Sequence, residues 1–282
     1  MFKKVFVLLS VLAVGLSSCS KWGNNNGNQD ILFVKYISSI EGGDGSMINF
    51  EYDTANRVSR IICSGNESEK VFDVKYDRQT IEVSNGVDNW IMRFNSFSSL
   101  ESWSSVVGMS ETKLSTFSYV INGYGYVFLA GIKRLSDSAE STVNWEGYCP
   151  MRQTNRWTDN AGAANITYST AIEYRYESLY SNIHANVNLF LILVPEFFEY
   201  AEIDNILAAG VSVFGTRVRY LPTKVSIKKT RSEVDHVETI SEVERVFSYD
   251  TDADGYVKTI YSGSGDDRTM LYDIKYFSAS AE

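Results

Sequence analysis

Apolar and polar residues alternate with period two along most of this chain. The alternation is clear in FEY at 50–52 and RVSRI at 57–61, and it returns at 247–249 and 257–260. A period of two is typical of β-strands with one face buried and the other in water. Segments of similar length and composition predict further strands at 32–37, 80–83, 90–94, 142–145, 183–194, 211–220 and 225–229.

One sequence motif occurs near both ends of the chain, and we call it the repeated phrase. FEYDTANRVSRI at 50–61 is repeated as FSYDTDADGYVKTI at 247–260, and VFDVKY at 71–76 returns as LYDIKY at 271–276. A weaker copy lies at 117–127. Asp, Asn and Gly stand between alternating runs, so each copy predicts a β-hairpin. In the last copy we expect a longer turn, from Thr251 to Gly255, in which Gly255 takes the positive φ.

The segment 195–207 has a different period. Pro195 opens it, acidic residues follow in its first turn, apolar residues recur every three or four positions, and Gly210 comes after it. These features predict a short helix that caps the sheet or plugs its concave side. The expected fold is therefore mainly all-β: a single large curved or barrel-like antiparallel meander with one short helix near 195–207. The pattern does not decide whether the sheet closes.

The start of the chain predicts export and lipidation. Lys3 and Lys4 precede an apolar run at 5–16 that is too short to remain as a membrane anchor, so residues 1–18 are expected to be a signal peptide. The run ends in LSSC, which has the form of a bacterial lipobox, and Cys19 is the predicted lipidation site. Residues 19–30 would form the lipidated end and a flexible tether, followed by a single β-rich domain at 31–282.

The residue after Cys19 and the net charge narrow the expected location and partners of the protein. Ser20 is not the Asp that commonly retains lipoproteins at an inner membrane, so we expect an outer-membrane location, with the periplasmic or cell-surface face left open. The net charge of −9 becomes −11 once Lys3 and Lys4 are removed with the leader, which argues against nucleic acid as a partner. Cys63 and Cys149 remain, and their pairing is left open.

The candidate catalytic and metal motifs are incomplete. The stretch 250–255, DTDADG, matches the first half of a calcium loop, but Tyr261 stands where the bidentate Glu belongs, so an acidic turn explains it better. His184 and His236 lack the spacing of a metal site. Glu242 and Glu244 share a strand face and are expected to be solvated. The glycine-rich 42–46 leads into a strand rather than a helix, so it is expected to be a loop. No catalytic residue, cofactor or metal is predicted.

Aromatic residues are the remaining candidates for a binding site. Trp90, Trp103, Trp145 and Trp157 could line a face that binds sugar or lipid, because aromatic rings offer a large apolar area. The alternative is that they pack the sheet core and its edges, and we favour this alternative.

Several motifs together resemble a known family. They are the Tyr-Asp hairpins, VNWEG at 143–147, the Asn-rich stretch 182–188 and YLPTKV at 220–225. In this order they resemble a domain-of-unknown-function family of lipoproteins from gut anaerobes that is described as porin-like. The resemblance spans most of residues 31–277 and implies a curved or barrel-like sheet. It supplies no activity.

Three functional hypotheses follow. The first is a non-enzymatic lipoprotein, anchored in the outer membrane, that serves as a binding or structural module of the envelope. The second is a carbohydrate-active enzyme, which would need two carboxylates in an aromatic-lined cleft. The third is a carrier of a lipophilic ligand, which would need an apolar cavity under the sheet. The membrane is the expected partner in the first hypothesis, with a glycan or lipophilic ligand left open.

Overall fold

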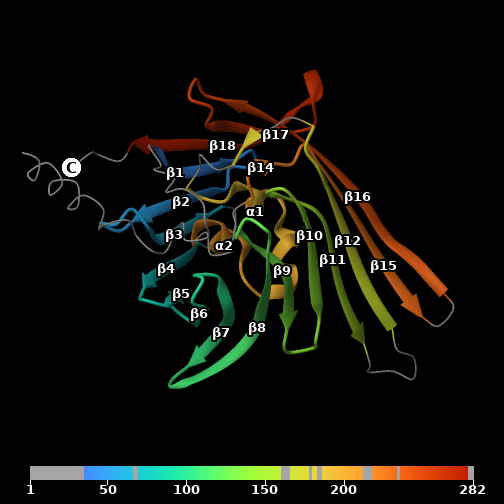
Figure 1. The fold of residues 1–282 in the computed structure, drawn as a ribbon. Coiled ribbons are helices and arrows are strands. Elements are labelled where there is room, and N and C mark those ends of the chain that lie inside the picture. The colour runs from blue at the N-terminus through green and yellow to red at the C-terminus, as the bar shows by residue number, and fades with distance from the viewer. Residues whose placement is uncertain are drawn as a thin grey trace, which may run out of the picture.

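The structure is a computed structural model that describes residues 35–65, 69–159, 166–177, 180–182, 186–211, 218–233 and 236–278. Within these residues, sixteen strands form a closed antiparallel barrel (Figure 1). The barrel closes because β1 pairs with β18 from Lys35 opposite Ser278 to Gly42 opposite Tyr272. The predicted all-β antiparallel meander is confirmed, and its two ends meet.

The wall follows chain order apart from one insertion between β12 and β15. Its strands are β1 (Lys35–Gly42), β2 (Met47–Tyr52), β3 (Val58–Ser64), β4 (Lys70–Tyr76), β5 (Thr80–Ser84), β6 (Asn89–Phe94), β7 (Leu100–Val107), β8 (Ser110–Ile121), β9 (Val127–Arg134), β10 (Glu140–Glu146), β11 (Cys149–Asp159), β12 (Ile166–Arg175), β15 (Lys224–Glu233), β16 (His236–Thr251), β17 (Val257–Ser262) and β18 (Thr269–Ser278). A short 3-10 helix, η2 (Gly265–Asp267), joins β17 to β18.

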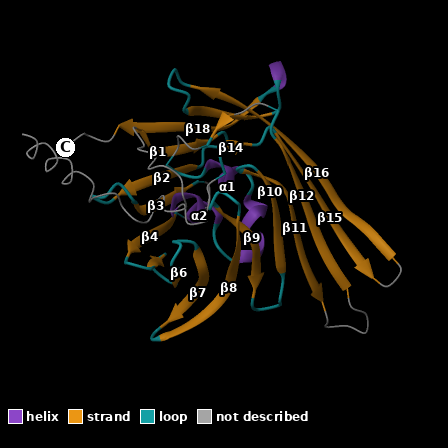
Figure 2. Cartoon of the chain, in the orientation of Figure 1, coloured by secondary structure: helices purple, strands orange, loops and turns teal. Residues whose placement is uncertain are grey.

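The insertion fills the barrel. It contains β13 (Tyr180–Ser181), α1 (Leu189–Leu193), the 3-10 helix η1 (Pro195–Ala201), α2 (Asn205–Val211) and β14 (Tyr220–Leu221). Figure 2 shows these helices enclosed by the ring of strands. We call residues 186–211 the plug. A Cβ on Gly210 would lie 2.7 Å from Cδ1 of Ile61, so glycine lets α2 approach β3 this closely.

The plug corrects three sequence predictions. The strand expected at 183–194 is wrong over its described part, because Leu189–Leu193 is helix α1; its apolar run is continuous because every residue in it is buried inside the barrel. The strand expected at 211–220 is wrong at Val211, which ends α2, and of its other described residues, 218–220, only Tyr220 lies in a strand, β14. The helix expected at 195–207 is broken at Glu202, whose φ of 58° ends η1 before α2 begins.

The repeated phrase encodes a repeated turn. Four five-residue turns begin with Asp53, Asn95, Asn122 or Asp252. In each, Oδ1 of that residue accepts the backbone N–H groups two and four residues later at 2.9–3.1 Å. The fourth residue of each turn has positive φ, and these residues are Asn56, Ser98, Gly125 and Gly255. The phrase is therefore architectural, and the chain carries one more copy, at 95–99, than the sequence analysis found.

The longer turn expected at 251–255 is wrong. The last turn is 252–256, which has the same length as 53–57. Asp250 belongs to β16, and its carboxylate accepts hydrogen bonds from Tyr261 and Arg268 instead. The offset of 200 between the flanking strands also has a structural basis. Tyr76 donates to the carbonyl of Val58, and Tyr276 donates in the same way to that of Val257.

The two faces of the wall differ in chemistry. Luminal side chains such as Ile61, Phe72 and Val74 are buried in one hydrophobic core with the plug. Outward side chains are largely charged, among them Glu51, Arg60, Asp73, Lys75, Glu82, Arg93, Lys133, Lys228 and Lys275. Several outward pairs join neighbouring strands, as in Arg60–Asp73 at 3.4 Å and Lys275–Glu41 at 3.2 Å.

Four strands continue beyond the plug. Figure 1 shows β11, β12, β15 and β16 reaching well past the helices, with β16 outermost. We call residues 156–159, 166–169, 230–233 and 236–239 the extension. β16 pairs with β17 only through 247–251, so in the described part of the chain residues 236–245 have a ladder partner on the β15 side alone. One side of the barrel is therefore open at this end.

Candidate functional site

Buried polar side chains of the wall hold the backbone of η1. Nε2 of Gln153 donates to the carbonyl of Phe197 at 2.9 Å, and Tyr174 donates to Oε1 of Gln153 at 3.1 Å. Nδ2 of Asn155 contacts the carbonyl of Glu196 at 3.4 Å. Burial raises the pKa of Tyr174 well above its usual value, so the hydroxyl remains a donor. These groups satisfy one another, which indicates a structural joint rather than a reactive centre.

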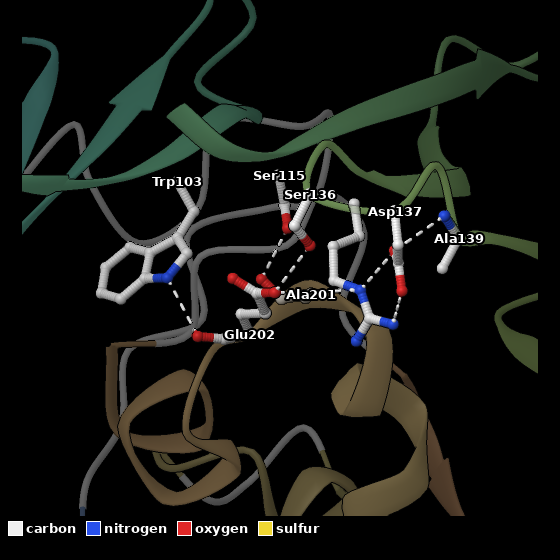
Figure 3. A network of polar contacts seen from close by, with 8 residues as sticks. Trp103, Ser115, Ser136, Asp137, Ala139, Ala201 and Glu202 are labelled. Atoms are coloured by element: carbon white, nitrogen blue, oxygen red, sulfur yellow. Dashed lines mark hydrogen bonds and ion pairs between the residues drawn. The ribbon is translucent and has the colours of Figure 1, made fainter. Parts of the chain in front are cut away.

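The end of η1 is fixed to a second part of the wall (Figure 3). The indole of Trp103 donates to the carbonyl of Glu202 at 3.1 Å, and Oγ of Ser115 donates to the carbonyl of Ala201 at 2.7 Å. Arg134 lies 3.8 Å from the Glu202 carboxylate and also pairs with Asp137. The hydrogen bond from Arg134 lowers the pKa of Asp137.

Acidic residues of the plug pair with basic residues from different strands. The pairs are Glu196–Arg245 at 2.6 Å, Glu199–Lys229 at 3.5 Å, Glu202–Arg134 at 3.8 Å and Asp204–Lys70 at 2.5 Å. Their basic partners come from β16, β15, β9 and β4. These ion pairs fix how the plug is seated, because each one ties it to a separate strand.

All four candidate tryptophans are on wall strands, and three of them pack closely against neighbouring residues. Trp103 is 2% exposed and stacks on Trp90 with ring centroids 5.8 Å apart. Trp145 donates to the carbonyl of Leu129 at 2.7 Å and packs against Phe128. Their indoles therefore serve packing and backbone hydrogen bonds.

Trp157 has different surroundings. It stacks face to face on Tyr168, with centroids 4.5 Å apart and planes 10° apart. The strand register continues this row through Arg231 to Glu238. We call these four residues, which cross the extension on β11, β12, β15 and β16, the open row.

The open row lies on the luminal face of the wall. Along β11, Trp157 is two and four residues from Asn155 and Gln153, which contact the plug, and alternate residues of a strand share a face. Beyond the plug this face is uncovered: Trp157, Tyr168 and Arg231 are partly exposed and Glu238 is exposed. An aromatic stack beside an Arg and a Glu is thus open to solvent inside the mouth of the barrel.

Sequence analysis missed Tyr168, Arg231 and Glu238. A usable signal exists for Tyr168, because residues paired across a hairpin have a constant sum of positions: Trp157 with Tyr168 and Asp159 with Ile166 both follow this rule. Arg231 lies opposite Tyr168 because the chain leaves the sheet after β12, forms the plug, and re-enters the sheet as β15. Its position in the row depends on the fold.

The other candidate residues are not brought together. Glu242 and Glu244 lie on the outer face, paired with Lys228 at 3.8 Å and Lys224 at 2.7 Å. His236 is exposed at the start of β16, and His184 lies outside the described residues. Residues 43–46 form the turn between β1 and β2, as expected of a loop. In the described ranges, no cluster of three or more His, Cys, Asp or Glu residues could hold a metal ion.

The two remaining cysteines are both free. Cys63 is half-buried on β3, and Cys149 is buried on β11. Burial raises the pKa of Cys63 to about 11, mainly because its thiolate would lose solvation, and raises that of Cys149 for the same reason. Both thiols are therefore protonated at neutral pH. Cys19 lies outside the described residues.

The fold defines a class: a closed sixteen-stranded antiparallel barrel with an internal plug. Among solved structures, the crystal structure of a porin-like protein from Bacteroides uniformis resembles it with a TM-score of 0.56 and 14% sequence identity. The match covers 86% of this chain and all of that one. The porin-like fold implied by the sequence motifs is thus confirmed. No family model and no curated protein matches the chain.

Proposed function

We propose that this chain is a non-enzymatic lipoprotein of the outer membrane that presents a plugged, water-facing barrel as a binding module. The observation that supports this proposal most directly is the polarity of the wall. A barrel that spans a bilayer turns apolar residues outward, and a charge on its lipid face costs about 2–4 kcal/mol at the midplane. This wall turns charged residues outward and apolar residues inward.

The filled lumen disfavours two other functions. A channel needs a water-filled interior, whereas Phe190, Phe197 and Phe198 of the plug are buried there. A carrier of lipophilic ligands needs apolar side chains that face a cavity. Here the luminal side chains beside the plug are in one packed core with it. In the described residues, no helix has the length and hydropathy to cross a bilayer.

The carbohydrate-active enzyme is the second candidate. It requires one carboxylic acid and one free carboxylate beside the aromatic residues. On the luminal side, Glu199 is paired with Lys229 at 3.5 Å, and Glu238 lies 4.0 Å from Arg231. Each of these carboxylates contacts a cation, so neither stands free beside the aromatic stack as a hydrolytic pair requires. Binding without hydrolysis fits this arrangement better.

The open row suits a glycan. A sugar ring can stack its C–H face on an aromatic surface, and its hydroxyl groups can bond to Arg231 and Glu238. The test is a glycan array probed with the purified protein, followed by titration of any hit. We expect Trp157→Ala to weaken that binding at least tenfold, by loss of about 1.4 kcal/mol or more. The matched control is Val237→Ala, because Val237 lies next to Glu238 of the open row on β16 and is 68% exposed. Equal binding by both variants would show that the glycan binds outside the open row. An array without hits would refute the proposal that the protein binds a glycan.

The anchor is tested separately. Cys19→Ala should abolish metabolic labelling with a fatty-acid analogue, because the thiol is the acylated group in a lipobox. Persistent labelling of this variant would refute the proposed lipidation site.

A further inference from the structure

The two ends of the barrel can be told apart by their turns. Each wall strand is antiparallel to its neighbours, so successive turns alternate between the ends. Lys35 begins β1 at the end that carries the turns 95–99, 122–126, 147–148 and 252–256. The contacts of Lys35 with Asp252 at 2.8 Å and Asp254 at 2.6 Å place that strand start beside the last of these turns. We call this end the tether end.

The tether end carries exposed aromatic and aliphatic side chains on one hairpin. Tyr124 is at the tip of the turn 122–126 and is 89% exposed, and Val120 and Ile121 before it are 52% and 57% exposed. On the neighbouring hairpin, Phe97 occupies the same position in its turn as Tyr124 and is 57% exposed. The other two turns of this kind have Ala55 and Asp254 there.

The exposed hairpin continues into an aromatic and cationic surface. The rings of Tyr126 and Tyr148 meet edge to face with centroids 5.1 Å apart. The exposed guanidinium of Arg219 lies 5.5 Å from the centroids of both Tyr148 and Tyr220. The membrane-facing patch, as we define it, comprises Val120, Ile121, Tyr124, Tyr126, Tyr148 and Arg219.

We infer that this patch rests on the phospholipid surface to which the chain is anchored. The inference relies on the proposed lipidation of Cys19. Residues 20–34 separate that anchor from Lys35, and fifteen residues span at most about 50 Å even when fully extended. Because Lys35 begins β1 at the tether end, the shortest path from the anchor leads to that end, which carries the patch.

The chemistry of the patch matches that of a lipid interface. Tyrosine favours the boundary between headgroups and acyl chains because its ring is apolar and its hydroxyl is polar. Val120 and Ile121 can enter the acyl boundary beside Tyr124, and Arg219 can pair with a phosphate. The opposite end also exposes apolar residues, such as Val107 and Met109 on one hairpin, and its aromatic stack, Trp157 on Tyr168, lies on the luminal face rather than at a turn tip. The inference predicts that lipid covers the tether end of the barrel and leaves the opposite end in water.

The experiment compares two turn tips in the acylated full-length protein. Tyr124→Cys and Met109→Cys are each labelled with an NBD fluorophore, and the unsubstituted protein serves as the labelling blank. Both sites are exposed in turns, so both variants should fold. The labelled proteins are reconstituted into vesicles of phosphatidylethanolamine and phosphatidylglycerol, and aqueous dithionite is added to reduce the accessible fluorophores.

We expect reduction at position 124 to be severalfold slower than at 109 on vesicles, and equally fast in detergent. Adding Ile121→Asp should restore fast reduction at 124, because a carboxylate in the patch opposes its contact with lipid. Fast reduction at both sites by protein that still floats with vesicles would overturn the docking alone. Protection at 109 instead would assign the opposite end. Protection at 124 without vesicles would mean that another protein copy covers the patch. Failure to float would refute the anchor and the inference with it.

Discussion

The strands β11, β12, β15 and β16 have different surroundings at their two ends. Beside the plug, Ile172 and Ile227 are buried in the core, and Gln153 bonds to the plug backbone. In the extension, the same face presents Trp157, Tyr168 and Arg231 to solvent. One strand thus provides stability along one part and an accessible surface along the other. The plug, rather than the wall, therefore determines which luminal residues are accessible to a ligand.

The largest expected effect concerns the plug core. Phe198 is 1% exposed in the plug, so Phe198→Ala should lower the free energy of unfolding by about 3–5 kcal/mol. Val237→Ala, in the extension, should change it by less than about 0.5 kcal/mol. Urea denaturation followed by circular dichroism measures both. Similar losses of unfolding free energy in the two variants would contradict the proposed difference between the plug and the extension.

Buried tyrosines should make the plugged region unfold in alkali. Burial raises the pKa values of Tyr52, Tyr76 and Tyr176 above the unfolded value, which is about 10. The unfolded chain then releases these protons first, so stability is intact below about pH 10 and falls as the pH rises above it, by about 1.4 kcal/mol per pH unit for each group.

Tyr76→Phe isolates one of these contributions. It should cost stability at neutral pH, through the lost bond to the carbonyl of Val58, and should reduce the alkaline slope by about 1.4 kcal/mol per pH unit. Unfolding measured at several pH values between 9 and 12 provides the slope. An unchanged slope would show that this hydroxyl is already ionised or accessible in the folded protein.

Ion pairs of the plug and of the outer face should also differ in their contribution to stability, by smaller amounts. Glu196 and Arg245 have side chains 15% and 36% exposed, so Glu196→Gln, which leaves Arg245 without its carboxylate partner, should cost about 1–2 kcal/mol. Glu242→Gln removes the more exposed pair with Lys228 and should cost about 0–0.5 kcal/mol. If thermal melting ranked the two variants in the opposite order, the seating role of the plug ion pairs would be wrong.

The repeated turn provides a test that is confined to one residue. Gly255 has a φ of 83° and no atom within 4 Å of a Cβ built on it, so the cost of Gly255→Val is conformational rather than steric crowding from neighbours. We expect a loss of about 1 kcal/mol or more, because a β-branched side chain disfavours positive φ. Gly255→Asn should be milder, since Asn56 occupies the equivalent position at 56°. Equal melting temperatures for the two variants would contradict this account of the turn.

Local features of the fold were accessible from the sequence, and contacts over long distances were not. Alternation located strands such as β5, β6 and β10, and turn residues located the hairpins at 53–57 and 252–256. The apolar run Leu189–Leu193 was assigned to a strand because a short segment buried on all sides looks the same in either structure. Closure of the barrel joins Lys35 to Ser278, a pairing that no local pattern specifies.

The candidate site shows the same division. Trp157 was identified as an aromatic candidate, but so were Trp90, Trp103 and Trp145, and only their surroundings separate them. Exposure depends on where the plug ends. Cys19 and the other residues before Lys35 lie outside the described part of the chain, so lipidation stays a prediction.

The most direct test of the central claim, that the barrel turns its charged face to water, is detergent phase partitioning of residues 20–282 produced without the leader and acyl chains. We predict that this protein folds without detergent and enters the aqueous phase of Triton X-114, because its outward residues are charged. Partitioning into the detergent phase, together with ion conductance in a planar bilayer, would contradict the account and indicate a membrane-spanning barrel.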